Sequence, residues 1–176
     1  MNEHDPRHPA PTDLGTARDA IDELLDTAAA AISPPLRWAD GPYTAVEHEH
    51  PYTREPDGTA HLEKRRYLMT RVAADRYPEL LGQLEAYWRG RGWAVSAEPD
   101  PVLPVLRAES PSGAVELRIG IPGNATLLAR VAPVPAVGTG YPFGGASTVP
   151  LGPDGALDTV PRHDDPYWSG REGRRG

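Results

Sequence analysis

Three histidines form the cluster whose residue types and spacing best fit metal chemistry. His48 and His50 are one residue apart, and His61 follows a predicted turn, on what should be the opposing strand. Residues two apart in a strand share a face, so His48 and His50 should lie together, with His61 across from them. Imidazole nitrogens arranged in this way can bind zinc. The alternative is polar surface, because this spacing is less specific than His-Glu-x-x-His or paired cysteines.

A second group with binding chemistry lies near the C-terminal end. Asp164, Asp165, Tyr167 and Trp168 combine two acids with two aromatic side chains inside a Pro- and Gly-rich stretch. Aromatic residues in such a segment either dock on a partner protein or anchor the segment to its own domain. Both interpretations are open from the sequence, and the first makes these four residues a candidate partner-binding motif.

Other familiar signatures of chemistry do not occur. The sequence has no Gly-x-Gly-x-x-Gly, phosphate-loop or Gly-x-Ser-x-Gly pattern. It has no Cys, which excludes disulfides, thiol nucleophiles and cysteine-based metal sites. We therefore expect no cofactor. A basic run at 64–66 could contact phosphate, but pairing with Glu47 and Glu49 across a hairpin is simpler. The charge of this run predicts an exposed arm at a sheet edge.

Composition and charge narrow the class of protein. The chain has 176 residues and a formal net charge of −7, and acids exceed bases most strongly in residues 1–42. This distribution argues against nucleic acid as a partner, because phosphate binding needs a basic face. No apolar run approaches the ~18 residues that span a bilayer, and the first residues lack the apolar region of a secretory signal. We therefore expect a cytoplasmic protein that binds neither nucleic acid nor membrane.

Hydrophobic periodicity predicts the elements that position these residues. Apolar residues at three- and four-residue steps predict helices over 13–33 and 76–90. Alternation predicts a hairpin and then a β-meander, with strands at 43–53, 59–72, 93–97, 105–109, 115–121 and 125–131. Trp93 opens the meander and should be central to the core. Its replacement by alanine should then cost ~3–5 kcal/mol through the cavity it leaves.

Together the elements predict one α+β domain over 12–132. We expect a two-layer sandwich in which two helices cover one face of an antiparallel sheet. Pro (21) and Gly (18) are concentrated at the ends of the chain. Residues 1–11 are therefore expected to be a disordered leader, and 133–176 a flexible Pro/Gly-rich tail.

The stretch 71–131 resembles small uncharacterised actinobacterial α+β proteins. The resemblance is carried by a helix that ends in Tyr87-Trp88, the strand start Gly92-Trp93 and the Ser-Pro-Ser-Gly turn that ends at Gly113. It covers about a third of the chain. It implies an α+β fold and brings no known activity with it.

These observations favour a non-catalytic module that binds another protein, similar to small acidic secretion chaperones and toxin-immunity proteins. The acidic first helix or the tail would make the contact. The alternative is an enzyme, or a domain that binds a small ligand or metal. Its pocket would lie between the helices and the sheet, near Tyr87, Arg89 or Arg107. The sequence leaves the oligomeric state open.

Overall fold

The computed structural model describes residues 9–98, 103–120, 124–137, 143 and 147–170. They form two helices, one short 3-10 turn and six strands. In chain order these are α1 (Leu14–Ala30), β1 (Trp38–Glu49), β2 (Pro56–Leu68), η1 (Ala74–Arg76), α2 (Tyr77–Gly90), β3 (Ala94–Glu98), β4 (Val105–Ser110), β5 (Gly113–Ile119) and β6 (Ala125–Pro135).

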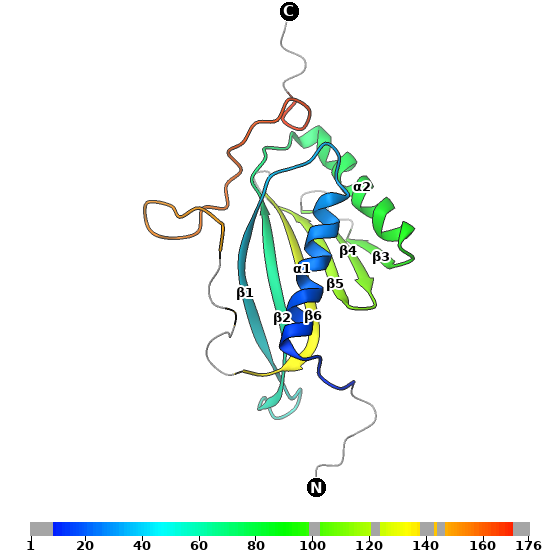
Figure 1. The fold of residues 1–176 in the computed structure, drawn as a ribbon, viewed down its shortest axis with the longest axis vertical. Helices are drawn as coiled ribbons and strands as arrows, with labels where there is room; N and C mark the ends of the chain where they lie inside the picture. Colours follow the sequence, from blue (N-terminus) through cyan, green and yellow to red (C-terminus); the bar gives the residue numbers. More distant parts are fainter. Residues whose placement is uncertain (1–8, 99–102, 121–123, 138–142, 144–146, 171–176) are drawn as a thin grey trace, which may run out of the picture.

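The strands form one antiparallel sheet in the order β1-β2-β6-β5-β4-β3. β6 pairs with both β2 and β5, so the hairpin and the meander join into a continuous sheet. Both helices lie on the same face, with α1 across β2, β6 and β5 and α2 over β3 and β4 (Figure 1). The predicted two-layer α+β fold, with two helices on one face of the sheet, is confirmed.

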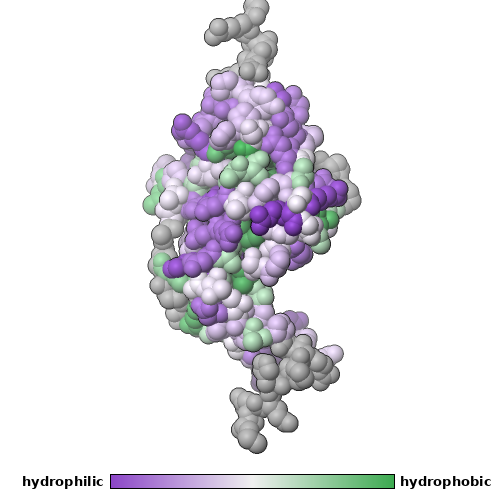
Figure 2. Space-filling view, turned by 45° about the vertical axis from the view of Figure 1, so that its right-hand side comes forward, coloured by the Kyte–Doolittle hydropathy of each residue, from purple (hydrophilic) through white to green (hydrophobic). Residues whose placement is uncertain are grey.

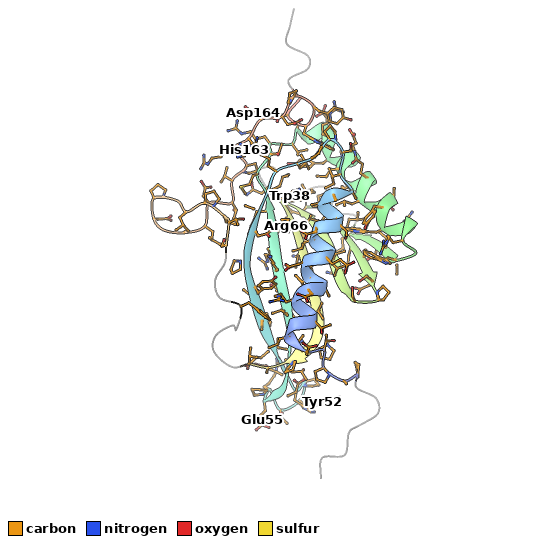
Figure 3. All side chains as sticks on the ribbon, in the orientation of Figure 1. Trp38, Tyr52, Glu55, Arg66, His163 and Asp164 are labelled. Atoms are coloured by element: carbon orange, nitrogen blue, oxygen red, sulfur yellow. The ribbon has the colours of Figure 1, made fainter. Side chains whose placement is uncertain are left out.

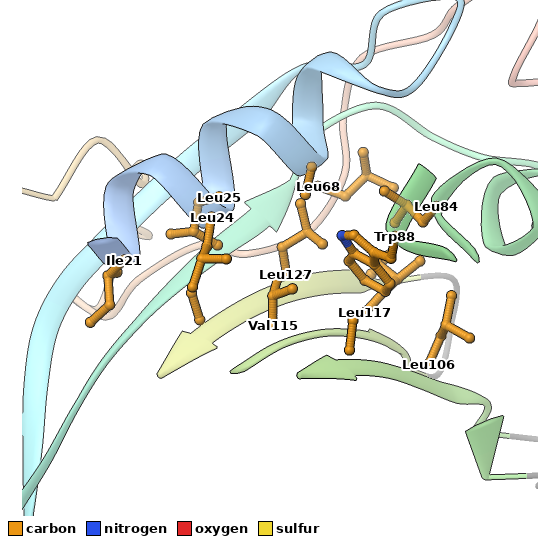
Figure 4. Packing of buried hydrophobic residues seen from close by; sticks show 14 of the residues in the cluster. Ile21, Leu24, Leu25, Leu68, Leu84, Trp88, Leu106, Val115, Leu117 and Leu127 are labelled. Carbon is orange, nitrogen blue, oxygen red and sulfur yellow. The ribbon is translucent and has the colours of Figure 1, made fainter. Parts of the chain in front are cut away.

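Apolar side chains fill the space between the two layers. α1 contributes Ile21, Leu24 and Leu25, and α2 contributes Leu84 and Trp88; each is at most 3% exposed. They meet the inward-facing residues of β4, β5 and β6 (Figure 4). Successive residues of a strand point to opposite faces, so only every second residue of these strands enters the core. The other residues point to the opposite face, away from α1 and α2.

β2 carries buried charges, and the prediction of an exposed arm at a sheet edge was wrong. Lys64 is 8% exposed, and its Nζ lies 2.9 Å from Asp22 of α1 and 3.3 Å from Asp40 of β1. Arg66 contacts Asp26 at 2.8 Å and Asp40 at 2.5 Å. β2 is an interior strand, between β1 and β6. The acids of α1 reach its basic side chains and compensate their charge.

The C-terminal segment packs against the domain. The backbone N–H of Thr148 donates to the carbonyl of Asp40 at 2.8 Å, and that of Arg71 donates to the carbonyl of His163 at 2.7 Å. His163 and Asp164 lie at one end of the molecule, and the β1–β2 turn lies at the other (Figure 3). β6 itself continues to Pro135, beyond the domain boundary predicted at residue 132.

A close approach between β5 and β6 requires glycine at position 113. A Cβ atom added there would lie 2.5 Å from the carbonyl oxygen of Arg130 and 3.0 Å from Cγ2 of Val131. We predict that Gly113→Ala destabilises the protein by ~1–3 kcal/mol, because backbone must move to make room. Gly82→Ala in α2 is the matched control, because nothing beyond its neighbours and the backbone of its own helix lies within 4 Å of the added Cβ. It should raise stability by up to ~1 kcal/mol through helix propensity. Urea unfolding measures both, and equal effects would contradict the prediction.

Candidate functional site

The face of the sheet opposite the helices, here called the uncovered face because neither helix lies on it, carries a group of arginines. The C-terminal segment packs over its β1–β2 side, where Val149 meets Ala39 and Met69. Arg107 of β4, Arg118 of β5, Arg130 of β6 and Arg65 of β2 all point to the uncovered face, because each alternates with a core residue of its strand. Arg107, Glu116, Leu128 and Arg65 are successive partners across four strands. The strand pairing therefore brings together residues that are far apart in the sequence.

Glu116 lies at the centre of one ionic cluster on this face. It is 4% exposed, and its Oε2 accepts hydrogen bonds from Nε and Nη2 of Arg107 at 3.0 and 2.7 Å. Its Oε1 accepts from Nε of Arg118. Burial raises the pKa of Glu116, but the hydrogen bonds from Arg118 and Arg107 outweigh it and hold the pKa below its usual value. Glu116 is therefore an ionised carboxylate that fixes two arginines.

Glu63 lies at the centre of a second cluster. It is 7% exposed, and its Oε2 lies 3.1 Å from Nη2 of Arg130 and 3.5 Å from Nε2 of His61. Its Oε1 lies 3.6 Å from Nη2 of Arg65. The two clusters repeat one design, in which a buried glutamate holds two arginines whose side chains are 38–54% exposed.

Two hollows lie on either side of Leu128, which both share. The first, of about 420 Å³, takes in the β4–β5 turn and includes Arg107 and Arg130; we call it the turn hollow. The second, of about 510 Å³, includes Arg65, Arg118 and Asn124; we call it the Asn124 hollow. Each hollow thus receives one arginine from each cluster.

Each hollow also contains a buried polar atom without a hydrogen-bond partner among the described residues. In the turn hollow it is Nε of Arg130, a donor, and in the Asn124 hollow it is Oδ1 of Asn124, an acceptor. Buried polar groups are usually paired, because leaving one unpaired costs ~1–3 kcal/mol. The lining of each hollow therefore includes a side chain with one enclosed, unpaired polar atom, a donor in the turn hollow and an acceptor in the Asn124 hollow, which reaches a bound molecule when the side chain turns into the hollow.

A pair of histidines adjoins the Glu63 cluster. Nε2 of His48 lies 3.1 Å from Nδ1 of His61, and Nδ1 of His48 lies 3.0 Å from Oγ1 of Thr59. One imidazole must donate in the His48–His61 contact and the other must accept, so the two rings cannot both be protonated there. His61 also faces Glu63 and Arg130, which links the pair to the arginines.

The three histidines predicted to form a metal site do not meet. His48 and His61 come together, but His50 lies in the β1–β2 turn, where its ring contacts Tyr52. A register shift between Glu47 and Glu49 interrupts the two-residue period of β1 that the prediction assumed. Over the part of the chain that the structure describes, no three His, Cys, Asp or Glu side chains are grouped to hold a metal ion.

Protonation of His61 should destabilise the fold in mild acid. Burial is the largest cause that lowers the pKa of His61 from 6.5, and the charges of Arg130 and His48 add to it against the opposing charge of Glu63. The unfolded chain then binds the proton at higher pH than the folded protein, so stability falls as the pH drops below ~6.5. Urea midpoints measured from pH ~7.5 to ~5 should decrease, with a shallower decrease in His61→Gln. His50→Gln is the control, and an equal effect there would contradict the assignment.

The predicted partner-binding motif in the C-terminal segment folds back on its own domain. Trp168 is fully buried, and its indole N–H donates to the carbonyl of Pro34 at 2.8 Å. Tyr167 donates to Glu79 of α2 at 2.5 Å. Asp165 accepts from the backbone N–H groups of both aromatic residues, and Asp164 lies 3.0 Å from Arg71. Of the two interpretations of this motif, the geometry matches the anchor.

The space between helices and sheet, where the alternative function requires a pocket, is packed. Tyr87 and Arg89 lie on α2, and Arg107 lies on the opposite, uncovered face, so the three do not converge. A cleft of about 600 Å³ opens at the edge of the packed layer, between α1, the end of α2 and the β4–β5 turn, and Arg91 and Trp93 line it. Figure 2 shows this side of the molecule, where hydrophilic side chains gather over α1 beside small hydrophobic patches.

Sequence reasoning missed the arginine clusters. The sequence feature that could have revealed them is the alternation of polar with apolar residues in the meander, as at Glu116 and Arg118 in β5. The alternation indicates which residues leave the core, but it does not indicate that the outward residues of four strands meet.

Comparisons of this chain with protein-family models, with curated proteins and with solved structures find no match. The resemblance to small actinobacterial α+β proteins therefore stays a prediction. Among the described residues, neither helix has the length and apolar character needed to cross a membrane.

Proposed function

We propose that this protein is a non-catalytic binding module whose partner is another protein, and that the uncovered face is the binding surface. The observation that carries the proposal is the pair of buried glutamates, Glu63 and Glu116, each holding two partly exposed arginines around Leu128. Ion pairs fix the orientation of these side chains before a partner arrives, which reduces the entropy lost on binding. Arginine is also among the residues most enriched at the energetic centres of interfaces.

The arrangement favours binding over catalysis. Both glutamates are bonded to arginines, and for Glu116 these bonds hold the pKa below its usual value, which makes it a poor proton donor. A chaperone or immunity protein, which acts by holding another chain, needs such a surface and no reactive group. We place its action in the cytoplasm, because a chain without Cys has no need of an oxidising compartment.

The experiment compares two double variants of equal charge as baits in extracts of the host cell. Arg65→Ala with Arg118→Ala alters the uncovered face, yet Glu63 keeps Arg130 and Glu116 keeps Arg107. Arg18→Ala with Arg89→Ala removes the same charge from the helices, where the partners are Asp19 and Glu85. A protein that binds the wild type and the helix variant but not the face variant supports the proposal. Equal capture by both variants contradicts it.

The cleft beside α2 supports a second candidate function, the binding of a small ligand. Its lining combines the aromatic ring of Trp93 with the guanidinium of Arg91, whose Cζ lies 5.6 Å from the ring centroid. Such a pair suits a planar molecule that carries negative charge. A change in Trp fluorescence with a set of aromatic carboxylic acids, lost in Arg91→Ala, would favour this function. No change with any member of the set would remove it.

A further inference from the structure

We infer that the uncovered face binds an acidic, extended peptide segment of its partner, with carboxylates on Arg65 and Arg118 and backbone groups on Asn124 and Arg130. This inference rests on the proposed function and specifies the chemistry of the partner. It follows from the charge of the face, from the two unpaired polar atoms and from the spacing of the hollows along the sheet.

Positive charge exceeds negative charge at the centre of the uncovered face. Each buried glutamate, Glu63 and Glu116, has one negative charge and lies against two guanidinium groups, which are always protonated. Glu98 lines the Asn124 hollow and Glu109 lines the turn hollow, but both side chains are exposed, so solvent and salt screen their charges. The whole chain has a net charge of −7, but this surface is locally positive and therefore attracts an acidic segment.

The two unpaired atoms favour a peptide over a simple anion. Oδ1 of Asn124 needs a hydrogen-bond donor, which a carboxylate ion lacks, whereas a peptide backbone provides N–H groups along its whole length. Nε of Arg130 needs an acceptor, which a peptide carbonyl or an acidic side chain provides. A polypeptide with acidic side chains therefore satisfies the acceptor, the donor and the surplus charge together.

The spacing of the hollows sets the length of the segment. Arg130 of β6 lies beside Ala114 of β5, because these two residues are partners across the strands. Arg118 lies four residues further along β5 than Ala114. At ~3.3 Å per residue this is roughly 13 Å, so an extended segment of about five residues reaches from one hollow to the other across Leu128.

The test measures the fluorescence anisotropy of a labelled peptide of about eight residues, rich in glutamate with one central leucine, against the full-length protein. We expect it to bind at least tenfold more tightly than its glutamine counterpart at ~50 mM salt, and to lose that advantage at ~500 mM salt. Binding should weaken about tenfold in the Arg65→Ala, Arg118→Ala variant and stay unchanged in the Arg18→Ala, Arg89→Ala control. Equal affinity for the two peptides, or equal loss in both variants, would overturn the inference.

Asn124→Ala provides a variant whose two effects have opposite sign. It removes a buried acceptor that has no hydrogen-bond partner among the residues the structure describes, so stability should be unchanged or higher. The same change should weaken the acidic peptide several-fold, because the bound backbone loses its partner. Loss of stability together with unchanged peptide affinity would overturn the role of Asn124.

Two competitors separate the source of the negative charge. A single-stranded oligonucleotide of the same charge should bind more weakly than the acidic peptide, and inorganic phosphate should displace the peptide only through its ionic strength. Tighter binding of either competitor would overturn the inference. The face variant can fail to capture a protein that the wild type captures while the glutamate-rich peptide and its glutamine counterpart bind with equal affinity. In that case the inference fails and the proposed function stands. If the face variant captures every protein that the wild type does, the proposed function itself fails.

Discussion

Replacing Trp168 by alanine should cost ~3–5 kcal/mol of folding free energy and lower the unfolding midpoint by ~10 °C. The side chain is fully buried in the main core, although it lies close to the C-terminal end of the chain. Its indole N–H donates to the carbonyl of Pro34, and its own carbonyl accepts from the N–H of Ala73. The substitution therefore opens a cavity, leaves the Pro34 carbonyl unpaired and weakens the hold on residues 147–170. Calorimetry measures the midpoint, and limited proteolysis should show faster cleavage within that segment.

Leu151→Ala is the control for Trp168→Ala within the same segment. Leu151 is 67% exposed, so its truncation should change stability by no more than ~0.5 kcal/mol. Tyr167→Phe tests the second contact of the motif, because it removes the hydrogen bond to Glu79 while keeping the ring over Arg76. It should cost ~1 kcal/mol. If Trp168→Ala were no more destabilising than Leu151→Ala, the C-terminal segment would not be part of the folded core.

Local patterns were sufficient to predict most of the fold. The apolar stripe that includes Ile21 and Leu25 indicated α1 and the face it buries, and strict alternation in β5 indicated Val115, Leu117 and Ile119 as core residues. These signals depend on the period of each element and need no knowledge of distant residues. Once two amphipathic helices and a set of antiparallel strands are predicted, few layer arrangements bury the apolar sides of both, and a sheet with the helices on one face is one of them.

The role of the C-terminal segment was not predictable from composition. Its Pro and Gly content resembles that of flexible chains, which gives no indication of a residue as buried as Trp168. The groups that hydrogen-bond Trp168 are the carbonyl of Pro34, after α1, and the N–H of Ala73, after β2, and both are distant from it in the sequence. Composition reports the average tendency of a segment to be solvated, whereas one aromatic side chain inserted into the core is enough to fix its position.

The candidate site depended on register, which sequence patterns define poorly. Arg65 lies beside Leu128 because of the pairing of β2 with β6, and a shift of one residue would have placed Lys64 or Arg66 there instead. The same dependence defeated the metal prediction, because the irregularity at Glu47–Glu49 separates His50 from His48. Each strand could be predicted by itself, but the identity of cross-strand neighbours required the assembled sheet.

Trp88 replaces Trp93 as the tryptophan whose loss should be most damaging where α2 leads into β3. Trp88 is fully buried between α2 and the sheet, beside Leu117 and Leu127 (Figure 4). Trp93 is only partly buried, and its ring lies 6.4 Å from that of Tyr87 beside the cleft. We therefore expect Trp88→Ala to cost ~3–5 kcal/mol and Trp93→Ala only ~1 kcal/mol, the amount that partial burial supports.

Trp88→Phe separates the packing of Trp88 from its polar group. The indole Nε1 of Trp88 is buried and has no hydrogen-bond partner among the described residues, so removing it relieves a penalty of ~1–3 kcal/mol. Phenylalanine keeps an aromatic ring in the same space, and the variant should therefore be much closer to wild type than Trp88→Ala. Urea unfolding of the three variants gives the order. If Trp93→Ala were as damaging as Trp88→Ala, the strand start rather than the helix would hold the two layers together, because the buried area of Trp93 alone cannot account for so large a loss.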